Sequence, residues 1–232
     1  MTDAPPPLPA RFPPTLVGQP ARAAMLRATL DLPPMQMSEI VLKTARYEDM
    51  KTWYQAVLGV APSHEHLPAR PAVYEPGRAL APADLKLCFI RILMQHPYSQ
   101  VLAIFEVPGT PSTQQESPGL HHMQFRNPSM DVLFTRYERL KALGIVPQRT
   151  MNHGPGTSFY YRDPDDNMVE LSAVNFAHEE DYLAYFRSDS FKRNPSGVPV
   201  DADAYVGRFR SGTALTDLVR IPASTPPPVC PP

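Results

Sequence analysis

Gly119-Leu120-His121-His122-Met123-Gln124-Phe125 opens the stretch of this chain that decides the fold, and Met168-Val169-Glu170-Leu171 closes it. Between them lie an amphipathic helix that we expect to end at Gly144 and an Asp-, Pro- and Asn-rich turn over 163–167. A histidine in one strand and a glutamate in a later strand offer an imidazole and a carboxylate. Together these groups suit a divalent first-row metal.

The same pattern occurs twice along the chain. Glu39 leads into a helix that should end at Gly59, and His122 leads into the helix that should end at Gly144. Both helices carry apolar residues at helical spacing. Glu39 and His122 lie 83 residues apart, as do Tyr54 and Tyr137 of the two helices. This shared offset predicts two copies of one module.

Strand-like segments follow each helix, so each module reads as strand, helix and three strands. The helices are too few to cover both faces of a doubly wound sheet, which favours the α+β class. We predict two tandem βαβββ modules that form a curved mixed sheet around a cavity, with a helical C-terminal extension. The expected strands after the helices are 72–74, 85–93 and 101–107 in the first module, and 146–151, 157–162 and 168–174 in the second. His64 and His66 are expected in a loop.

Proline marks the ends of the chain, which holds 30 prolines in 232 residues. Because proline removes a backbone donor, we predict largely disordered Pro-rich segments at both ends. The predicted organisation is a Pro-rich segment over 1–36, modules over 37–110 and 117–175, a helical extension over 176–221 and a Pro-rich tail over 222–232.

The composition excludes several classes of function. A formal net charge of −1 gives no basic field for nucleic acid or an anionic membrane. The chain has no apolar run of about 18 residues, so we expect no membrane span. Its two cysteines, Cys88 and Cys230, cannot form a disulfide framework, and the first residues lack the apolar core of a secretion signal. We therefore expect a cytoplasmic protein.

The motifs over about 37–221 resemble the vicinal oxygen chelate superfamily, which includes glyoxalase I, bleomycin-resistance proteins and extradiol dioxygenases. Within it the chain is most similar to dihydroxybiphenyl-dioxygenase-like proteins. The resemblance implies metal ligands in the first strand of each module and in the last strand of the second. These positions hold Glu39, His122 and Glu170. Extradiol enzymes carry histidine where this chain has Glu39. The implied cofactor is a divalent metal, with Fe²⁺ favoured and Mn²⁺, Zn²⁺ or Ni²⁺ as alternatives.

The resemblance also implies catalytic roles for His153 and Tyr160. It implies oxidation or ring cleavage of a catechol-like small aromatic, by a monomer or homodimer. Two alternatives stay open because Glu39 replaces a histidine. One is a glyoxalase-like isomerase or lyase, and the other is a metal-free member that binds a small molecule.

Structural explanations compete with these roles. His122 could be a half-buried strand histidine, with His121 on the opposite face. Glu170 could point to solvent on an alternating strand. Glu39 could be a solvent-facing residue or a relic of a lost metal site. His153 could be only a turn residue, and one of Tyr160 and Tyr161 must face away from any cavity.

Overall fold

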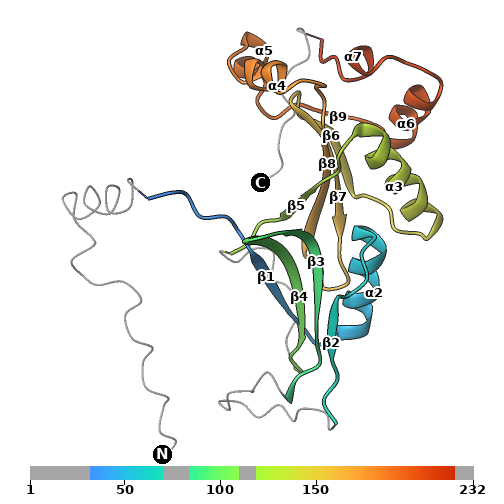
Figure 1. The fold of residues 1–232 in the computed structure, drawn as a ribbon. Coiled ribbons are helices and arrows are strands. Elements are labelled where there is room, and N and C mark those ends of the chain that lie inside the picture. The colour runs from blue at the N-terminus through green and yellow to red at the C-terminus, as the bar shows by residue number, and fades with distance from the viewer. Residues whose placement is uncertain (1–31, 70–83, 110–118, 223–232) are drawn as a thin grey trace, which may run out of the picture. The chain divides into compact units, whose positions relative to one another are not determined.

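The computed structural model describes residues 32–69, 84–109 and 119–222. The unit described below begins at Glu39 and includes both modules and the C-terminal helices. Figure 1 labels its elements along the chain. The predicted strand 72–74 and most of the two Pro-rich ends lie outside the described residues.

Each module contains the predicted strand, helix and three strands. The two helices, α2 and α3, begin 83 residues apart, as the repeat requires. The first module consists of β1 (Glu39–Thr44), α2 (Tyr47–Leu58), β2 (His64–His66), β3 (Leu87–Gln95) and β4 (Tyr98–Glu106). The second consists of β5 (Met123–Arg126), α3 (Met130–Ala142), β6 (Arg149–Asn152), β7 (Gly156–Arg162) and β8 (Met168–Val174).

The strands form two open mixed sheets with one shared topology. The first sheet has the order β1-β4-β3-β2, and the second has the order β5-β8-β7-β6 with a short strand, β9 (Val198–Pro199), added at its edge. In each module the first strand runs parallel to the last, and the other neighbours within the module are antiparallel. The α+β prediction of two tandem βαβββ modules is therefore confirmed.

The prediction of a loop around His64 and His66 is wrong. These residues form β2, in which His64 pairs with Phe89 and His66 pairs with Leu87. The polar sequence His-Glu-His gives no apolar alternation, so its strand character comes from pairing with β3 rather than from local preference.

The two helices form for the reasons that their sequences indicate. Both bury a stripe of apolar and aromatic side chains at helical spacing. Ser129 caps α3 by accepting a hydrogen bond from the Val132 amide at 3.2 Å. Gly59 ends α2 with a left-handed φ of 70°, and Gly144 follows α3 with a φ of 79°.

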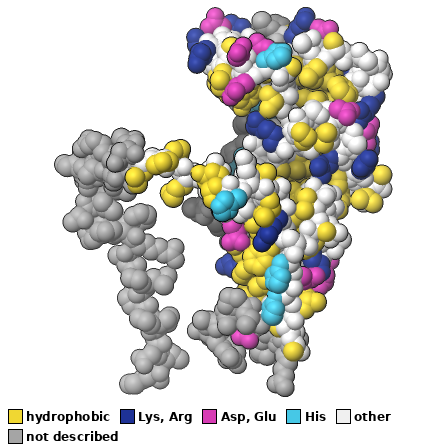
Figure 2. Space-filling view, in the orientation of Figure 1, with side chains coloured by type: hydrophobic (Ala, Val, Ile, Leu, Met, Phe, Trp, Pro, Cys, Tyr) yellow, Lys and Arg dark blue, Asp and Glu magenta, His cyan; other side chains and the backbone are white. Residues whose placement is uncertain are grey.

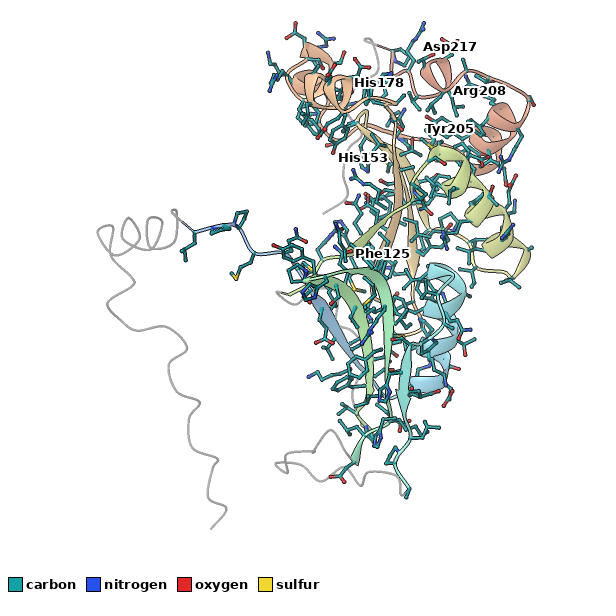
Figure 3. The ribbon with its side chains drawn as sticks, viewed as in Figure 1. Phe125, His153, His178, Tyr205, Arg208 and Asp217 are labelled. Atoms are coloured by element: carbon teal, nitrogen blue, oxygen red, sulfur yellow. The ribbon has the colours of Figure 1, made fainter. Side chains whose placement is uncertain are left out.

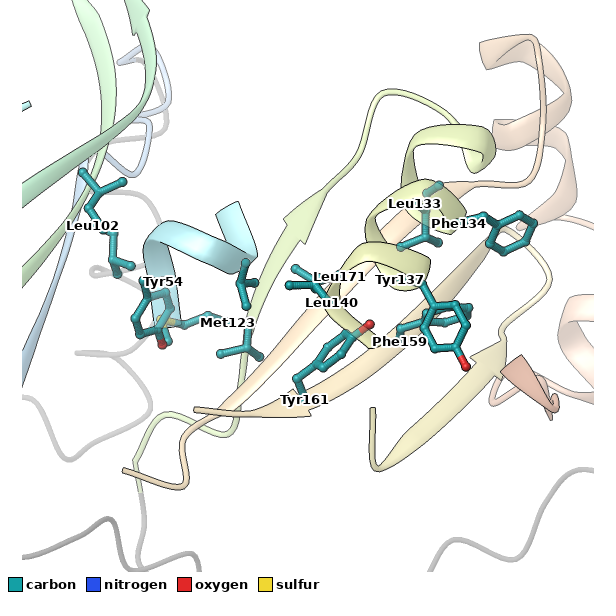
Figure 4. Close-up of a cluster of buried hydrophobic side chains, with 14 of the residues drawn as sticks. Tyr54, Leu102, Met123, Leu133, Phe134, Tyr137, Leu140, Phe159, Tyr161 and Leu171 are labelled. Atoms are coloured by element: carbon teal, nitrogen blue, oxygen red, sulfur yellow. The ribbon is translucent and has the colours of Figure 1, made fainter. Parts of the chain in front are cut away.

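One buried cluster draws on both modules and on the C-terminal helices. Figure 4 shows part of it, with Tyr54 of α2, Phe134 of α3 and Phe159 of β7 among the labelled side chains. Tyr161 is buried in this cluster and Tyr160 belongs to the opposite face, which confirms that the two tyrosines point apart.

Polar contacts also join the modules. The Tyr54 hydroxyl donates to Asp163 Oδ2 at 2.8 Å, and Arg136 Nη1 donates to the Val57 carbonyl at 2.6 Å. Asp163 also accepts hydrogen bonds from Asp165 and Asn167 in its own turn. Burial raises the pKa of Asp163, and these hydrogen bonds counteract part of that rise. The Asp-Pro-Asp-Asp-Asn turn thus holds the first module as well as reversing the chain.

The C-terminal extension adds four short helices and β9. The helices are α4 (Glu179–Tyr185), α5 (Asp189–Arg193), α6 (Ala202–Arg210) and α7 (Leu215–Leu218). The sequence predicted a helical extension over 176–221, but it did not predict the strand β9. Strand β9 pairs with β6 through Pro199 opposite Met151 and Val198 opposite Asn152. The extension therefore completes the second sheet.

Acidic and basic side chains are interspersed over the face shown in Figure 2. Within the described ranges, every helix is too short or too polar to span a bilayer.

Candidate metal and substrate site

A row of polar side chains crosses four neighbouring strands of the second module. Gln124 of β5 lies opposite Glu170 of β8, Glu170 lies opposite Tyr160 of β7, and Tyr160 lies opposite Arg149 of β6. Residues paired directly across strands share one face of a sheet. The topology therefore gathers these four side chains on the face opposite Tyr161.

Glu170 is the centre of this row and is only 4% exposed. Its Oε2 lies 3.0 Å from His122 Nε2, and its Oε1 accepts a hydrogen bond from Gln124 Nε2 at 2.8 Å. A buried carboxylate without partners would cost several kcal/mol. Glu170 thus points into the site rather than to solvent, and it meets His122 there as the sequence predicts.

The sequence predicted that the two adjacent histidines point to opposite faces, and this prediction is wrong. Their Nδ1 atoms lie 2.7 Å apart. The prediction failed because β5 begins at Met123, so His121 and His122 precede the strand and do not follow its alternation. One Nδ1 must donate and the other accept. If His121 donates, the neutral His122 carries its proton on Nε2 and donates it to Glu170. If His122 donates from Nδ1, its Nε2 keeps a lone pair beside Glu170, and only this tautomer can bind a metal through Nε2.

His153 and Tyr160 form the second part of the site. His153 Nδ1 lies 2.8 Å from the Ser196 carbonyl oxygen, and Nε2 lies 2.9 Å from the Tyr160 hydroxyl. A carbonyl oxygen only accepts hydrogen bonds, so Nδ1 must carry a proton. In the neutral imidazole Nε2 then accepts from the Tyr160 O–H. Burial, and then the charge of Glu170, raise the pKa of Tyr160 to about 12, so its hydroxyl keeps its proton at neutral pH.

The C-terminal extension holds His153 in place (Figure 3). The Ser196 carbonyl belongs to a turn in which the buried Asn194 side chain bonds both the amide and the carbonyl of Gly197. Gly197 has a φ of 78°, and a Cβ there would lie 2.1 Å from the Asn152 carbonyl oxygen. Only glycine allows this close approach, which brings Ser196 to His153.

Glu39 is not brought to this pair. It begins β1 opposite Val101, it is exposed, and its side chain makes no hydrogen bond or ion pair with another described residue. Within residues 32–69, 84–109 and 119–222, no group of three or more His, Cys, Asp or Glu side chains is placed to hold a metal ion. The predicted ligands therefore appear as one adjacent pair, His122 and Glu170, and one separate residue.

The adjacent pair fits a metal. Two donors at about 2.1 Å from one ion, at a right angle to each other, lie about 3.0 Å apart. The His122 and Glu170 atoms have this 3.0 Å spacing. An imidazole and a carboxylate also suit Fe²⁺, Mn²⁺ and Zn²⁺. The spacing is compatible with two neighbouring positions in an octahedral coordination sphere, and it is equally the length of a hydrogen bond between the two groups.

A pocket of about 190 Å³ lies beside Glu170 and His153. It is distinct from two cavities of about 250 and 490 Å³ that lie along β9 and α6 and contain none of the predicted site residues. The smaller pocket reaches the Glu170 carboxylate and the His153 imidazole, and the other two do not. Its lining consists of Gln124, Arg126, His153, Pro155, Gly156, Ser158, Glu170, Ser172, Ala173 and Tyr182.

Sequence reasoning missed several members of the site. Gln124 is revealed by strand pairing, because it lies directly opposite Glu170. Arg149, whose guanidinium carbon lies 4.3 Å from the centroid of the Tyr160 ring, is revealed only by strand register. The Ser196 carbonyl required the tertiary structure, because 43 residues separate it from His153.

The sequence of this chain is similar to those of several known proteins. The Glyoxalase/Bleomycin resistance protein/Dioxygenase superfamily model matches residues 36–171. Biphenyl-2,3-diol 1,2-dioxygenase 2 of Rhodococcus globerulus is 34% identical over 184 residues, covering 78% of this chain and 84% of that protein. Biphenyl-2,3-diol 1,2-dioxygenase 3 of the same organism is 30% identical over 185 residues, covering 79% and 86%.

Among solved structures, a glyoxylase/bleomycin resistance protein/dioxygenase domain from Frankia sp. EAN1pec is similar to this chain. It is 18% identical, with a TM-score of 0.48, and the match covers 61% of this chain and 99% of that domain. The family match and the two curated relatives together extend over both modules. This chain belongs to the glyoxalase/bleomycin resistance protein/dioxygenase superfamily.

Proposed function

We propose that this protein is a metal-dependent enzyme that oxidises or cleaves the ring of a small catechol-like aromatic. The observation that carries the proposal is the 3.0 Å approach of His122 Nε2 to Glu170 Oε2 beside a pocket. The curated relatives, whose names describe dioxygenases of an aromatic diol, support this type of reaction.

His122 and Glu170 would hold the metal, with Fe²⁺ favoured and Mn²⁺, Zn²⁺ or Ni²⁺ as alternatives. The bound ion would supply Lewis acidity and, if it is iron, one-electron chemistry toward an aromatic diol. Gln124 would keep the Glu170 carboxylate oriented through its 2.8 Å hydrogen bond. Glu39 stays a predicted third ligand, to be tested by metal binding.

Tyr160 and His153 would move a proton. A substrate hydroxyl next to Tyr160 can give its proton to the tyrosine oxygen while the Tyr160 O–H proton passes to His153 Nε2. His153 can accept that proton because its Nδ1–H is already bonded to the Ser196 carbonyl. The reverse transfer would return a proton to the product. Imidazole suits both directions near neutral pH.

A second candidate is a member of the superfamily that binds a small molecule without a metal. It is favoured by one observation, namely that the described residues assemble two protein ligands rather than three. An isomerase or lyase of glyoxalase type is the third, because Glu39 stands where ring-cleaving relatives are expected to carry histidine. The substrate class, the monomeric or dimeric state and the cytoplasmic location are predictions that accompany the first proposal.

Oxygen uptake tests the proposal. The full chain is loaded anaerobically with Fe²⁺ and then mixed with air-saturated buffer and a panel of catechols. We expect oxygen consumption that requires both iron and an aromatic diol, and its loss in His122→Ala. Metal binding without oxygen uptake on any diol would favour an isomerase or lyase, and no metal binding would favour the metal-free candidate.

A further inference from the structure

We propose that Arg126 and Ser172 form a subsite for a carboxylate, so that the ligand is a small single-ring aromatic acid. The inference rests on the proposed function for the diol part of the substrate. The subsite itself is a binding site that can be tested without any reaction. It is carried by the register of the second sheet, by an unpartnered buried hydroxyl and by an exposed guanidinium.

Register places a second polar row beside the row of Glu170. Arg126 of β5 lies opposite Ser172 of β8, and Ser172 lies opposite Ser158 of β7. All three residues line the pocket that also contains Glu170 and His153. Each is two residues along its strand from a member of the first row, so the two rows are neighbours on one face.

The Ser172 hydroxyl needs a partner. Ser172 is 2% exposed, and its Oγ has no hydrogen-bond partner among the described residues. Its carbonyl oxygen already accepts from the Asn127 amide at 2.7 Å. A buried hydroxyl that stays unpaired costs about 1–3 kcal/mol. A ligand oxygen in the pocket would remove this cost, because a hydroxyl readily donates to a carboxylate.

Arg126 supplies the charge. Its side chain is exposed, and among the described residues no carboxylate forms an ion pair with it. A guanidinium presents parallel N–H donors that match the two oxygens of a carboxylate. Arg126 and Ser172 thus offer a fork of donors and a hydroxyl donor to the same side of the pocket.

The carboxylate of Glu170 does not oppose such a ligand directly. Both of its oxygens are engaged, one with His122 and one with Gln124. Ser172 lies about 6–7 Å further along the strand, because each strand residue advances the chain by about 3.3 Å. The ligand's negative group would therefore sit at the Arg126 end, with its ring extending toward Glu170 and His153.

The pocket limits the size of the ligand. Its volume of about 190 Å³ is below the roughly 300–1,000 Å³ typical of sites for drug-sized ligands. One aromatic ring with small polar substituents fits this space better than two joined rings. The expected ligand class is therefore a dihydroxybenzoate or dihydroxyphenylacetate type of acid.

Calorimetric binding to the full chain tests the subsite with benzoate and benzamide, which share a shape and differ in charge. We expect benzoate to bind about tenfold or more tightly than benzamide, equivalent to about 1.4 kcal/mol. Arg126→Gln should abolish this preference and Ser172→Ala should reduce it, whereas Arg126→Lys should retain part of it. Arg139→Gln removes an equal charge from the exposed side of α3 and should leave the preference unchanged. Equal binding of the two probes by the wild type, or an unchanged preference in a folded Arg126→Gln protein, would overturn the proposal.

Turnover separates this inference from the proposed function. With iron-loaded protein, Arg126→Gln should raise the ratio of KM for 3,4-dihydroxybenzoate to KM for catechol about tenfold or more. Oxygen uptake with catechol, without a preference for benzoate over benzamide, would contradict the subsite and support the proposed function. A benzoate preference that depends on Arg126, without uptake on any diol, would sink the function and leave the subsite standing.

Discussion

The two modules have the same strand order, but most equivalent positions in two rows of their sheets are polar in the second module and apolar in the first. The row Gln124, Glu170, Tyr160 and Arg149 in the second module corresponds to the row Val41, Ala103, Phe89 and His64 in the first. The next row corresponds similarly: Arg126, Ser172 and Ser158 stand where the first module has Lys43, Phe105 and Leu87.

The shared topology places equivalent positions in both modules, and the side chains at those positions determine whether a site forms. Ala103 of β4 occupies the position equivalent to Glu170, so the first module has no carboxylate at this point of its sheet. The second module also gains β9 and the Ser196 carbonyl from the C-terminal extension. Function therefore belongs to particular residues grafted onto one of two similar scaffolds.

The largest expected effect comes from copying the carboxylate into the first module. Ala103 is fully buried, so Ala103→Glu would bury a charge that lacks His122 and Gln124 as partners. We expect a loss of about 3–5 kcal/mol in the free energy of unfolding, measured by urea denaturation. Val41→Glu, in the same row but 45% exposed, is the control and should change stability little. A stable Ala103→Glu protein would mean that the two faces tolerate the same chemistry.

The next effect concerns the extension that only the second module receives. Gly197→Ala places a Cβ 2.1 Å from the Asn152 carbonyl oxygen at a φ of 78°, and we expect it to cost about 3 kcal/mol. Gly212→Ala has a similar φ of 88° but open space around it, and should cost only about 1 kcal/mol. Thermal unfolding of both variants measures the difference. Equal losses would show that Gly197 is not needed for the close approach of Ser196 to His153.

A smaller effect should come from the hydrogen bond that joins the modules. Tyr54→Phe removes the donor that reaches Asp163 at 2.8 Å, while Asp163 keeps its contacts to Asp165 and Asn167. We expect a loss of about 2 kcal/mol, because the lost bond involved a buried carboxylate. Tyr98→Phe, at a tyrosine that is 48% exposed, is the control and should be near neutral. Chemical denaturation that shows equal stability for both variants would contradict a role for this bond.

The smallest effect is a pH dependence at the same contact. Burial raises the pKa of Asp163 above its ordinary value, so the folded protein holds this proton more tightly than the unfolded chain. The stabilisation that comes from this tighter proton binding is complete below about pH 4, the ordinary aspartate range. It is lost as the pH rises through the pKa of Asp163 in the folded protein. Asp163→Asn should therefore show a shallower fall in stability from about pH 4 toward neutral than the wild type. Parallel pH profiles of unfolding free energy would contradict this.

The sequence predicted the repeated part of the fold because that part depends on local patterns. Both helices follow their apolar stripes, and β8 has the predicted bounds of Met168 to Val174. β2 and β9 were missed because each is a short segment whose strand character comes from its neighbour. Pairing across a sheet is a tertiary property, so no local pattern could reveal it.

The sequence likewise predicted some residues of the candidate site and missed others. The pairing of His122 with Glu170, and of His153 near Tyr160, follows from positions that the sequence marked. The partners that orient them, such as Gln124 and the Ser196 carbonyl, depend on register and on the extension. The family resemblance implied Glu39 as a third ligand, and no group of three such ligands is found among the described residues.

Metal stoichiometry tests the central claim that His122 and Glu170 together hold a metal. The full chain is equilibrated anaerobically with Fe²⁺ or Mn²⁺, separated from free metal, and measured by elemental analysis beside His122→Ala, Glu170→Gln and Glu39→Ala. The account predicts close to one ion per wild-type chain and the loss of that ion in His122→Ala and Glu170→Gln. The metal content of Glu39→Ala shows whether Glu39 is a third ligand. Metal content that is equal in the wild type, His122→Ala and Glu170→Gln would contradict the account.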